Sequence, residues 1–520
     1  MQHSTHKLSL KEKVGYSLGD AAANFVWRSS FFIPVFYTDT FGLAAAHAAI
    51  LLLIVRLTDG VTDVIMGSIA DRTNTRHGKF RPWILWSTPA VALFLILIFT
   101  TPDFSYTGKL IYAAIIYFCL TQAYTANNVP YGALMGVMTD SVKERASLAS
   151  FRFMGAFAGG LLVMASLPYL VATLGEGDDA AGYQYTMYIF ATVLVIFMLI
   201  TYATTRERIT PPPQENQLPF WSEMKDLFWN MPVILLPIAG VGFFVISLTL
   251  ENPNAKYIGA VLVIASFWYA AHLRGKLISR PRETLTNTQR DMADLLSNKP
   301  WLILLGVGIM FGLFTVVRPS AAIYYFKYYL ERPDLIGIYF AITLVASLAA
   351  AMATGALSKR FNKRSLMAAA FILGSVFNGA IYFVSPEQVT LMLTLATIGE
   401  FFAGMMPVLF FSMLGDTVDY SEWKNDRRAT GLIYSAGTFI NKTGHGFAGA
   451  MVLIVLTLYG YDAKIESTHS SALDGMVLLM TGIPVVIGIL GTIFVAWYPL
   501  NDKQMHEIEG ELIARRKARE

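Results

Sequence analysis

The sequence GSIADR (Gly67–Arg72) and a second sequence, GALSKR (Gly355–Arg360), decide the architecture of this chain. Each follows an apolar run and leads through small residues into a short basic segment, so the same feature occurs once in each half of the sequence. A repeat of this kind predicts two similar halves of six helices each. Membrane proteins built from repeated halves place their binding site between the halves, near the middle of the bilayer.

The composition of the 520 residues indicates an all-α membrane protein. Hydrophobic residues make up 55% of the chain and charged residues 15%, whereas soluble domains contain about 25% charged residues. Apolar runs long enough to cross a bilayer as helices recur along nearly the whole sequence. We predict fourteen spans, at 15–38, 45–70, 83–101, 110–138, 147–173, 184–204, 232–250, 257–273, 300–330, 335–357, 366–384, 389–415, 430–459 and 475–498.

Other features exclude several functions. A net charge of +4 is too small to indicate nucleic-acid binding. The single cysteine, Cys119, excludes a disulfide framework and a cysteine metal site. An enzyme would need a nucleophile with its base or a cluster of metal ligands, and the 8 histidines are scattered. We therefore expect no catalytic residues and no cofactor, and the polar first fourteen residues do not resemble a removable signal peptide.

The distribution of Lys and Arg orients the spans. These residues concentrate in alternate loops, and the positive-inside rule then places both termini in the cytoplasm. The predicted organisation is an N-terminal half at 1–208, a central region at 209–299 and a C-terminal half with a cytoplasmic tail at 300–520. The central region contains the two extra spans, joined by the turn Glu251 to Asn254, and a basic linker.

The second predicted span contains two carboxylates. Asp59 and Asp63 are four residues apart, so they lie on one helical face. A charge at mid-bilayer costs roughly 2.5–3.5 kcal/mol, which makes each one a candidate site. Two such carboxylates repel each other unless a cation or proton lies between them, and Thr58 and Thr62 could add oxygen ligands for sodium. Alternatively, Asp59 merely neutralises Arg56 and Asp63 faces the cytoplasm.

The first predicted span carries a polar stripe. Asp20, Asn24 and Arg28 follow one another at four-residue steps and should face the protein interior. The planar guanidinium of Arg28 suits bidentate recognition of a carboxylate or sulfonate. The alternative is an internal ion pair of Arg28 with Asp20 or Asp59.

Further polar residues lie within other spans. Asn127 and Asn128 precede Pro130, which frees backbone carbonyls, although an Asn in a span often only joins helices. Lys442 must meet a carboxylate or a substrate, whereas Arg318 and Glu400 could simply pair with each other. The other members of this set are Arg152, Asn441 and His445.

Several motifs together resemble the glycoside-pentoside-hexuronide:cation symporter family of the major facilitator superfamily. They are Tyr16 to Asn24, Arg56-x-x-Asp59-x-x-x-Asp63-x-x-Met66-Gly67, Arg76-x-Gly78-Lys79-Phe80-Arg81-Pro82-Trp83, Asn128-x-Pro130-Tyr131, Glu144-Arg145, Arg152 and Gly415-Asp416-x-x-Asp419-Tyr420-x-Glu422-Trp423-Lys424. The resemblance covers both halves and implies a major facilitator fold, two six-helix bundles, which this chain exceeds by its central hairpin.

The resemblance also implies site residues. The coupling cation, sodium or proton, would bind Asp59 and Asp63 with help from Thr125 and Asn128. The sugar would bind Asn24, Asn128, Arg152 and Lys442, with Arg28 beside them.

Departures from the family pattern favour an acidic sugar. Melibiose-type members have Asp at the positions of Asn24 and Asn128, and Trp at those of Gly132 and Pro407. Loss of two negative charges and gain of Arg28 favour uronates or other acidic saccharides.

We therefore expect a symporter that imports an acidic glycoside across a bacterial inner membrane. Its expected partners are the sugar, the cation and membrane lipid, and it should be monomeric. The alternatives are a symporter of a neutral glycoside or pentoside, and an efflux carrier with fourteen spans. A membrane-embedded enzyme or lipid carrier is disfavoured.

Overall fold

The computed structural model describes residues 7–139, 141–209, 221–222, 225, 232–248, 253–281, 285, 287–425, 430–463 and 470–519. Most of these residues are helical and the others form loops, in which one isolated β-bridge joins Thr75 and Gly78. They form two compact units. The first consists of Met1–Leu218, Glu331–Leu344 and Asp462–Ser467, and the second of Pro219–Leu330, Val345–Tyr461 and Thr468–Glu520.

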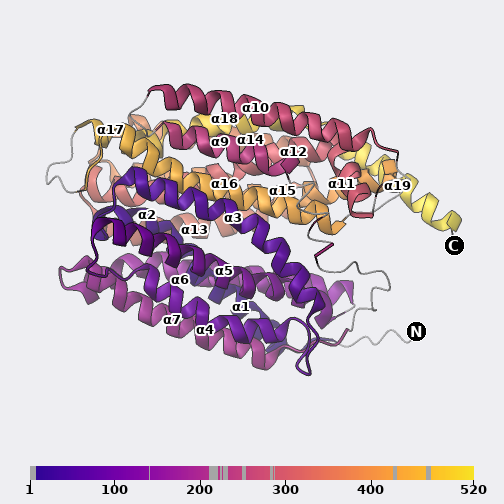
Figure 1. Ribbon diagram of the computed structural model, residues 1–520, viewed down its shortest axis with the longest axis horizontal. Coiled ribbons are helices and arrows are strands. Elements are labelled where there is room, and N and C mark those ends of the chain that lie inside the picture. Colours follow the sequence, from indigo (N-terminus) through magenta and orange to yellow (C-terminus); the bar gives the residue numbers. More distant parts are fainter. Residues whose placement is uncertain are drawn as a thin grey trace. The chain divides into compact units, whose positions relative to one another are not determined.

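The first unit is built from the N-terminal helices (Figure 1). They are α1 (Leu10–Ser29), η1 (Ser30–Phe32), α2 (Ile33–Val35), η2 (Phe36–Thr40), α3 (Ala45–Arg72), α4 (Arg81–Ile98), α5 (Tyr106–Met138), α6 (Val142–Gly175) and α7 (Asp179–Thr204). Helix α1 packs on α6 and α7, α4 packs on α5 and α7, and α3 packs on α5. Four of the helices that carry predicted site residues, α1, α3, α5 and α6, are thus joined in one bundle.

The second unit contains most of the remaining elements. They are α9 (Pro232–Ser247), α10 (Pro253–Ile278), α11 (Asn287–Ser297), α12 (Lys299–Tyr324), η4 (Tyr325–Tyr329), η5 (Pro333–Leu335), α13 (Ile336–Leu357), α14 (Lys363–Ala380), η6 (Ile381–Phe383), α15 (Val389–Asn425), α16 (Thr430–Leu458), α17 (Ser470–Met480), α18 (Gly482–Trp497) and α19 (Asp502–Arg519). Of these, η5 and the start of α13 belong to the first unit. Helix α12 packs on α16, and α14 packs on α15 and α18.

The all-α membrane class is confirmed. Helical elements occupy the described part of each of the fourteen predicted stretches, and the repeated sequences at Gly67–Arg72 and Gly355–Arg360 both fall at the C-terminal end of a helix, α3 and α13. Within the described ranges, ten helices are long and apolar enough to cross a membrane, and Leu235–Ser247 is a shorter apolar helix. The number of fourteen membrane crossings stays a prediction.

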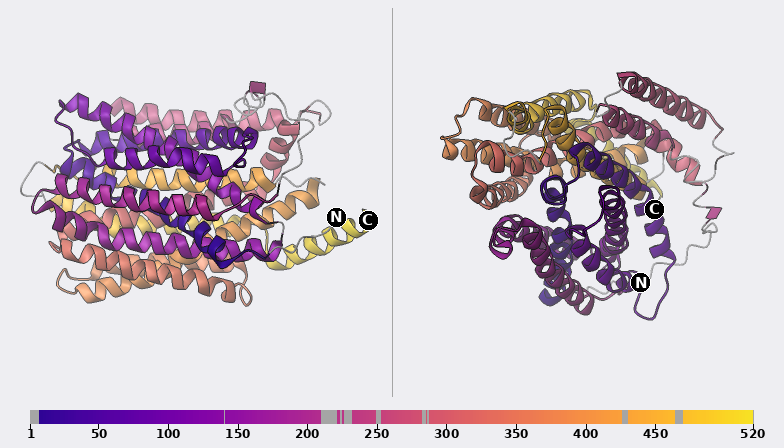
Figure 2. Two further views of the ribbon diagram at one scale, coloured as in Figure 1. Left: turned by 90° about the horizontal axis from the view of Figure 1, so that it is seen from below. Right: turned by 60° about the vertical axis from the view of Figure 1, so that its left-hand side comes forward.

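Several helix boundaries differ from those predicted. The last predicted span, 475–498, is interrupted at Thr481 between α17 and α18, because Pro484 has no N–H and its ring would clash with the carbonyl of Met480. Helix α15 continues about three turns past residue 415, to Asn425. Helices α11 and α19 were not predicted, and α19 extends past the ends of the other helices of its unit (Figures 1 and 2).

The first helix of each predicted half ends in a π-helical turn. In η2 the backbone N–H of Phe41 donates to the carbonyl of Phe36 at 2.8 Å, and in η4 the N–H of Leu330 donates to the carbonyl of Tyr325 at 2.9 Å. Each bond spans five residues instead of the four of an α-helix. The sequence repeat therefore extends to a backbone irregularity that hydropathy does not reveal.

Two glycines bring α1 and α6 into close contact. A Cβ atom on Gly155 would lie 2.1 Å from the carbonyl oxygen of Ser17, and one on Gly159 would lie 2.5 Å from that of Ala21. Any larger residue would therefore push the helices apart. This close approach determines which polar side chains of the two helices can meet.

The central hairpin consists of α9 and α10, which lie side by side (Figure 1). A Cβ atom on Gly240 of α9 would lie 2.3 Å from the Ser266 hydroxyl of α10, so small residues form their contact. Helix α9 also touches α16. The start of the predicted turn, Glu251 and Asn252, lies outside the described residues.

Candidate functional site

An ion pair joins α1 to α6. Arg152 donates from Nε to Asp20 Oδ2 at 2.6 Å and from Nη2 to Asp20 Oδ1 at 3.5 Å. The guanidinium also lies over the ring of Tyr131, 5.4 Å from its centroid. The Tyr131 hydroxyl in turn donates to the carbonyl of Tyr16 at 2.7 Å, and the two tyrosine rings stack at 4.7 Å. Arg152 is thereby fixed by contacts from both α1 and α5.

The other two residues of the α1 stripe lie against α6. A Cβ atom on Gly160 would lie 3.1 Å from Arg28 Nε and 3.5 Å from Asn24 Oδ1. The Asn24 amide donates to the carbonyl of Asp20 at 2.9 Å, within its own helix. The Arg28 guanidinium lies 5.6 Å from the centroid of the Phe31 ring. Asn24 and Arg28 thus both lie against α6 at Gly160, C-terminal to the Asp20–Arg152 pair on α1.

Arg56 on α3 is held by a carboxylate and two aromatic rings. Its Nη1 donates to Asp59 Oδ2 at 3.2 Å, and Asp59 is buried with 6% exposure. The guanidinium lies 5.3 Å from the ring of Trp27 and 5.7 Å from that of Tyr117. The ion pair between Asp59 and Arg56, which the sequence analysis gave as an alternative, is therefore present in the structure.

Asp63 contacts a neighbouring helix. The Thr125 hydroxyl of α5 donates to Asp63 Oδ1 at 2.9 Å. The hydroxyls of Thr58 and Thr62 donate to carbonyls of their own helix, at 2.7 Å and 3.1 Å at the closest. The oxygen atoms of these two hydroxyls still have lone pairs that can bind a cation. The carboxylates and hydroxyls here are all oxygen donors, which suits a hard cation such as sodium.

The adjacent asparagines of α5 have different roles. Asn127 is buried with 3% exposure, and its amide donates to the Ser87 hydroxyl at 2.9 Å and to the Ile84 carbonyl at 3.3 Å. It therefore joins α5 to α4, which is the role that the sequence left open. Asn128 is turned about 100° around the helix from Asn127 and is half-buried.

In the second unit, Arg318 and Glu400 pair with each other, as the sequence allowed. Arg318 of α12 is 2% exposed, hydrogen-bonds Glu400 of α15 and Asn378 of α14, and donates to the carbonyl of Ala396 at 3.1 Å. Lys442 lies on α16 of the same unit and is half-buried.

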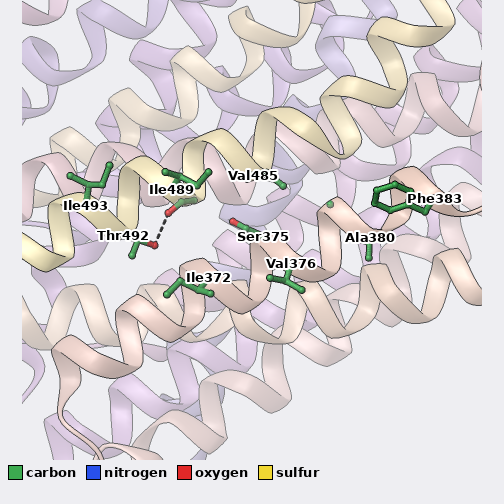
Figure 3. Close-up of a pocket in the computed structure, with 11 residues that line it drawn as sticks. Ile372, Ser375, Val376, Ala380, Phe383, Val485, Ile489, Thr492 and Ile493 are labelled. Carbon is green, nitrogen blue, oxygen red and sulfur yellow. Dashed lines mark hydrogen bonds between the residues drawn. The ribbon is translucent and has the colours of Figure 1, made fainter.

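A pocket of 690 Å³ lies between α14 and α18 of the second unit (Figure 3). Its walls are mainly apolar and include Ile372, Val376, Ile489 and Ile493, with Phe383 at one end. None of the predicted site residues lines it. Its apolar lining does not suit a sugar, which needs polar partners for its hydroxyl groups.

Buried ionic and polar groups within long apolar helices define a polytopic membrane transporter. The chain belongs to the family described as MFS/sugar transport protein, whose sequence profile matches residues 15–257 and 254–502. It is therefore a transporter of the major facilitator type and not an enzyme.

Similar proteins span nearly the whole chain. The isoprimeverose transporter of Lactiplantibacillus pentosus is 27% identical and covers 97% of this chain and 90% of its own. The glucuronide carrier protein homolog of Escherichia coli K12 is 27% identical, with coverage of 99% and 98%. The inward-open xylose transporter XylE of E. coli has a TM-score of 0.53 at 13% identity, with coverage of 96% and 98%, and shows the same fold.

Proposed function

We propose that this protein is a cation:sugar symporter that imports an acidic glycoside across a bacterial inner membrane. In this proposal it acts as a monomer with both termini in the cytoplasm. The observation that carries it is the hydrogen bond from Thr125 to Asp63, one helical turn from Asp59. It supports a compact set of oxygen ligands between α3 and α5.

The proposed cation site uses Asp59, Asp63 and Thr125, with Asn128 nearby on α5. A monovalent cation between the two carboxylates would offset their repulsion. Arg56 offsets one of the two carboxylate charges through its ion pair with Asp59. That balance favours a single sodium ion, or one proton, over a divalent ion.

The proposed sugar site uses Asn24, Arg28, Asn128, Arg152 and Lys442. The Arg152 charge is already offset by Asp20 at 2.6 Å, so Arg152 is better placed to bind hydroxyl groups than an anion. The proposal assigns the acidic group of the substrate to Arg28 and Lys442. The names of the two relatives include one acidic and one neutral sugar, which makes substrate charge the property to test.

Helix α5 provides a physical route for coupling. Thr125 and Asn128 are three residues apart, so they lie on one face of α5 about one turn apart. An ion that draws in the Thr125 hydroxyl also orients the turn that carries Asn128. Such coupling between two ligands is reciprocal, so sugar should raise cation affinity by the same factor. The membrane potential supplies roughly 2.3 kcal/mol per charge and per 100 mV.

The test compares two matched probes, p-nitrophenyl β-D-glucuronide and p-nitrophenyl β-D-glucoside, in proteoliposomes. Uptake is measured under an inward sodium gradient, under an inward proton gradient and with neither. Concentrative uptake of the glucuronide under one gradient is expected, and preference for the glucoside would refute the acidic substrate.

Variants then test the cation site. Asp63→Asn should abolish gradient-driven accumulation while exchange of substrate across the membrane persists. Thr121→Val is the matched control, because the Thr121 hydroxyl donates to the Phe118 carbonyl of its own helix at 2.8 Å, one turn from Thr125. An Asp63→Asn protein that still concentrates substrate would refute the site.

A further inference from the structure

The carboxylate of Glu207 accepts three backbone hydrogen bonds from a distant loop. Oε2 accepts from the N–H of Lys79 at 2.7 Å, and Oε1 accepts from those of Phe80 at 2.8 Å and Arg81 at 2.9 Å. Glu207 lies three residues after the end of α7, in a segment with no helix of its own. One side chain thus satisfies three consecutive amides of the first unit.

These amides belong to the N-terminus of α4. Its N-cap residue, Phe80, makes no side-chain capping bond, and the first N–H groups of any helix have no partner within that helix. The N-terminus also carries a partial positive charge that a carboxylate stabilises. Glu207, which follows α7 in the sequence, therefore caps α4 in place of the local Ser, Thr, Asp or Asn that helices generally use.

The loop before α4 is shaped around this carboxylate. Gly78 has φ of +107°, and a Cβ atom on it would lie 2.5 Å from Glu207 Oε1. The Thr75 hydroxyl closes the loop by donating to the Gly78 carbonyl at 2.7 Å. Glycine is thus needed at position 78 both for the backbone conformation and for the space that Glu207 occupies.

The segment around Glu207 also holds two other helices. The N–H groups of Arg208 and Ile209 both donate to the carbonyl of Val137, at 2.9 Å and 3.0 Å, close to the end of α5. The Arg208 side chain pairs with Glu12 in the first turn of α1. Residues 205–209 therefore connect α7 with the ends of α1, α4 and α5.

Arg81 adds a second link between α4 and α7, which pack side by side (Figure 1). Its Nη2 donates to the Tyr202 carbonyl at 2.7 Å, and its guanidinium lies 4.6 Å from the centroid of the Tyr202 ring. This link does not satisfy the amides of residues 79–81, so it cannot replace the contribution of Glu207.

We propose that Glu207 is a positioning residue for transport. It fixes the loop 73–80 and the start of α4 to the end of α7, so that one end of the first unit moves as a single body when the carrier changes conformation.

Hydrogen exchange on the purified full-length protein tests the contact directly. Glu207→Gln keeps the size of the side chain but replaces one acceptor oxygen with an NH₂ donor that faces backbone N–H groups. The amides of residues 79–81 should then exchange at least tenfold faster, which corresponds to about 1.4 kcal/mol. Trypsin should also begin to cut the Lys79–Phe80 bond. Gly78→Ala should give the same two changes, because its methyl group displaces the carboxylate.

Transport kinetics test the functional part, using whichever p-nitrophenyl glycoside the wild-type protein carries. Glu207→Gln should lower the maximal rate per folded carrier at least tenfold and leave KM unchanged, because the substrate residues lie elsewhere. Glu207→Asp should restore part of the rate. Arg206→Gln, a change at an exposed neighbour, is the control and should alter neither quantity. Unchanged amide exchange, an unchanged maximal rate, or a rate and KM that change in proportion would each overturn the proposal.

Discussion

Removing Glu400 should destabilise the protein more than removing its partner, Arg318. In Glu400→Leu the guanidinium stays buried at 2% exposure and cannot lose its charge, which costs about 3–5 kcal/mol. In Arg318→Met the carboxylate left behind is less completely buried, at 16% exposure of its side chain, so we expect about 2–3 kcal/mol.

Changing both residues should cost less than either single change. The double variant loses the bonds of Arg318 to Asn378 and to the Ala396 carbonyl, at about 1 kcal/mol each, but leaves no buried charge. The expected cost is therefore about 1–2 kcal/mol, and the coupling between the two sites is at least about 3 kcal/mol.

Equilibrium unfolding in mixed SDS–detergent micelles, followed by tryptophan fluorescence, measures these costs. Asp334→Asn serves as the control, because it breaks the Arg332–Asp334 ion pair, whose side chains are 51% and 59% exposed, and should cost under about 1 kcal/mol. If Glu400→Leu cost no more than this control, or if the double variant cost the sum of the two single ones, the assignment of a buried charge pair would be refuted.

Three further predictions concern substrate charge, topology and acid stability. Arg28→Gln should weaken binding of the glucuronide probe at least a hundredfold, about 3 kcal/mol, and leave the glucoside unaffected; equal weakening of both in isothermal titration would make Arg28 a structural residue. Cysteines at Asn254 and Arg280 should react with an impermeant maleimide from opposite sides of the membrane. Labelling of both positions from the same side would contradict the prediction that the hairpin crosses the membrane. The pKa of Glu144 is lowered from 4.5 mainly by its hydrogen bond with Lys13, so its stabilising contribution is present above pH 4.5 and is lost as the pH falls through the lower pKa of the folded state. The thermal midpoint of the wild-type protein should therefore fall faster below pH 4.5 than that of Glu144→Gln, and parallel curves would exclude this contribution.

The helices that were predicted well are those with a local signal. An apolar run of sufficient length specifies a membrane helix without reference to the rest of the chain. Helices α11 and α19 escaped prediction because they are polar or amphipathic, with one face against a neighbour: Met505, Ile508 and Leu512 of α19 are buried. A search for continuous apolar runs does not detect three buried residues separated by charged ones.

The pairing of the site residues could not be predicted, because each partner comes from a different helix. The sequence placed Asp20 and Arg28 on one stripe and left open which cation meets Asp20; the structure brings Arg152 of α6 to it. That choice depends on how closely α1 and α6 approach at Gly155 and Gly159, which helical periodicity does not report.

Glu207 was missed for a related reason. The motif from Arg76 to Trp83 includes the end of the loop before α4, but the carboxylate that the loop binds is more than a hundred residues away along the chain. The local signal was the lack of a capping side chain at Phe80. An uncapped helix start is a prediction that some distant group will supply the cap.

The two π-helical turns, η2 and η4, are informative about the ancestry of the chain. A π-turn contains one residue more than an α-helical turn, and here that extra residue follows the first helix of each half, at Phe36–Thr40 and at Tyr325–Tyr329. Two independent insertions at corresponding places are a less economical history than one insertion in a single six-helix ancestor. A single insertion in a repeated six-helix unit therefore accounts for both turns, although the side chains at the two places differ.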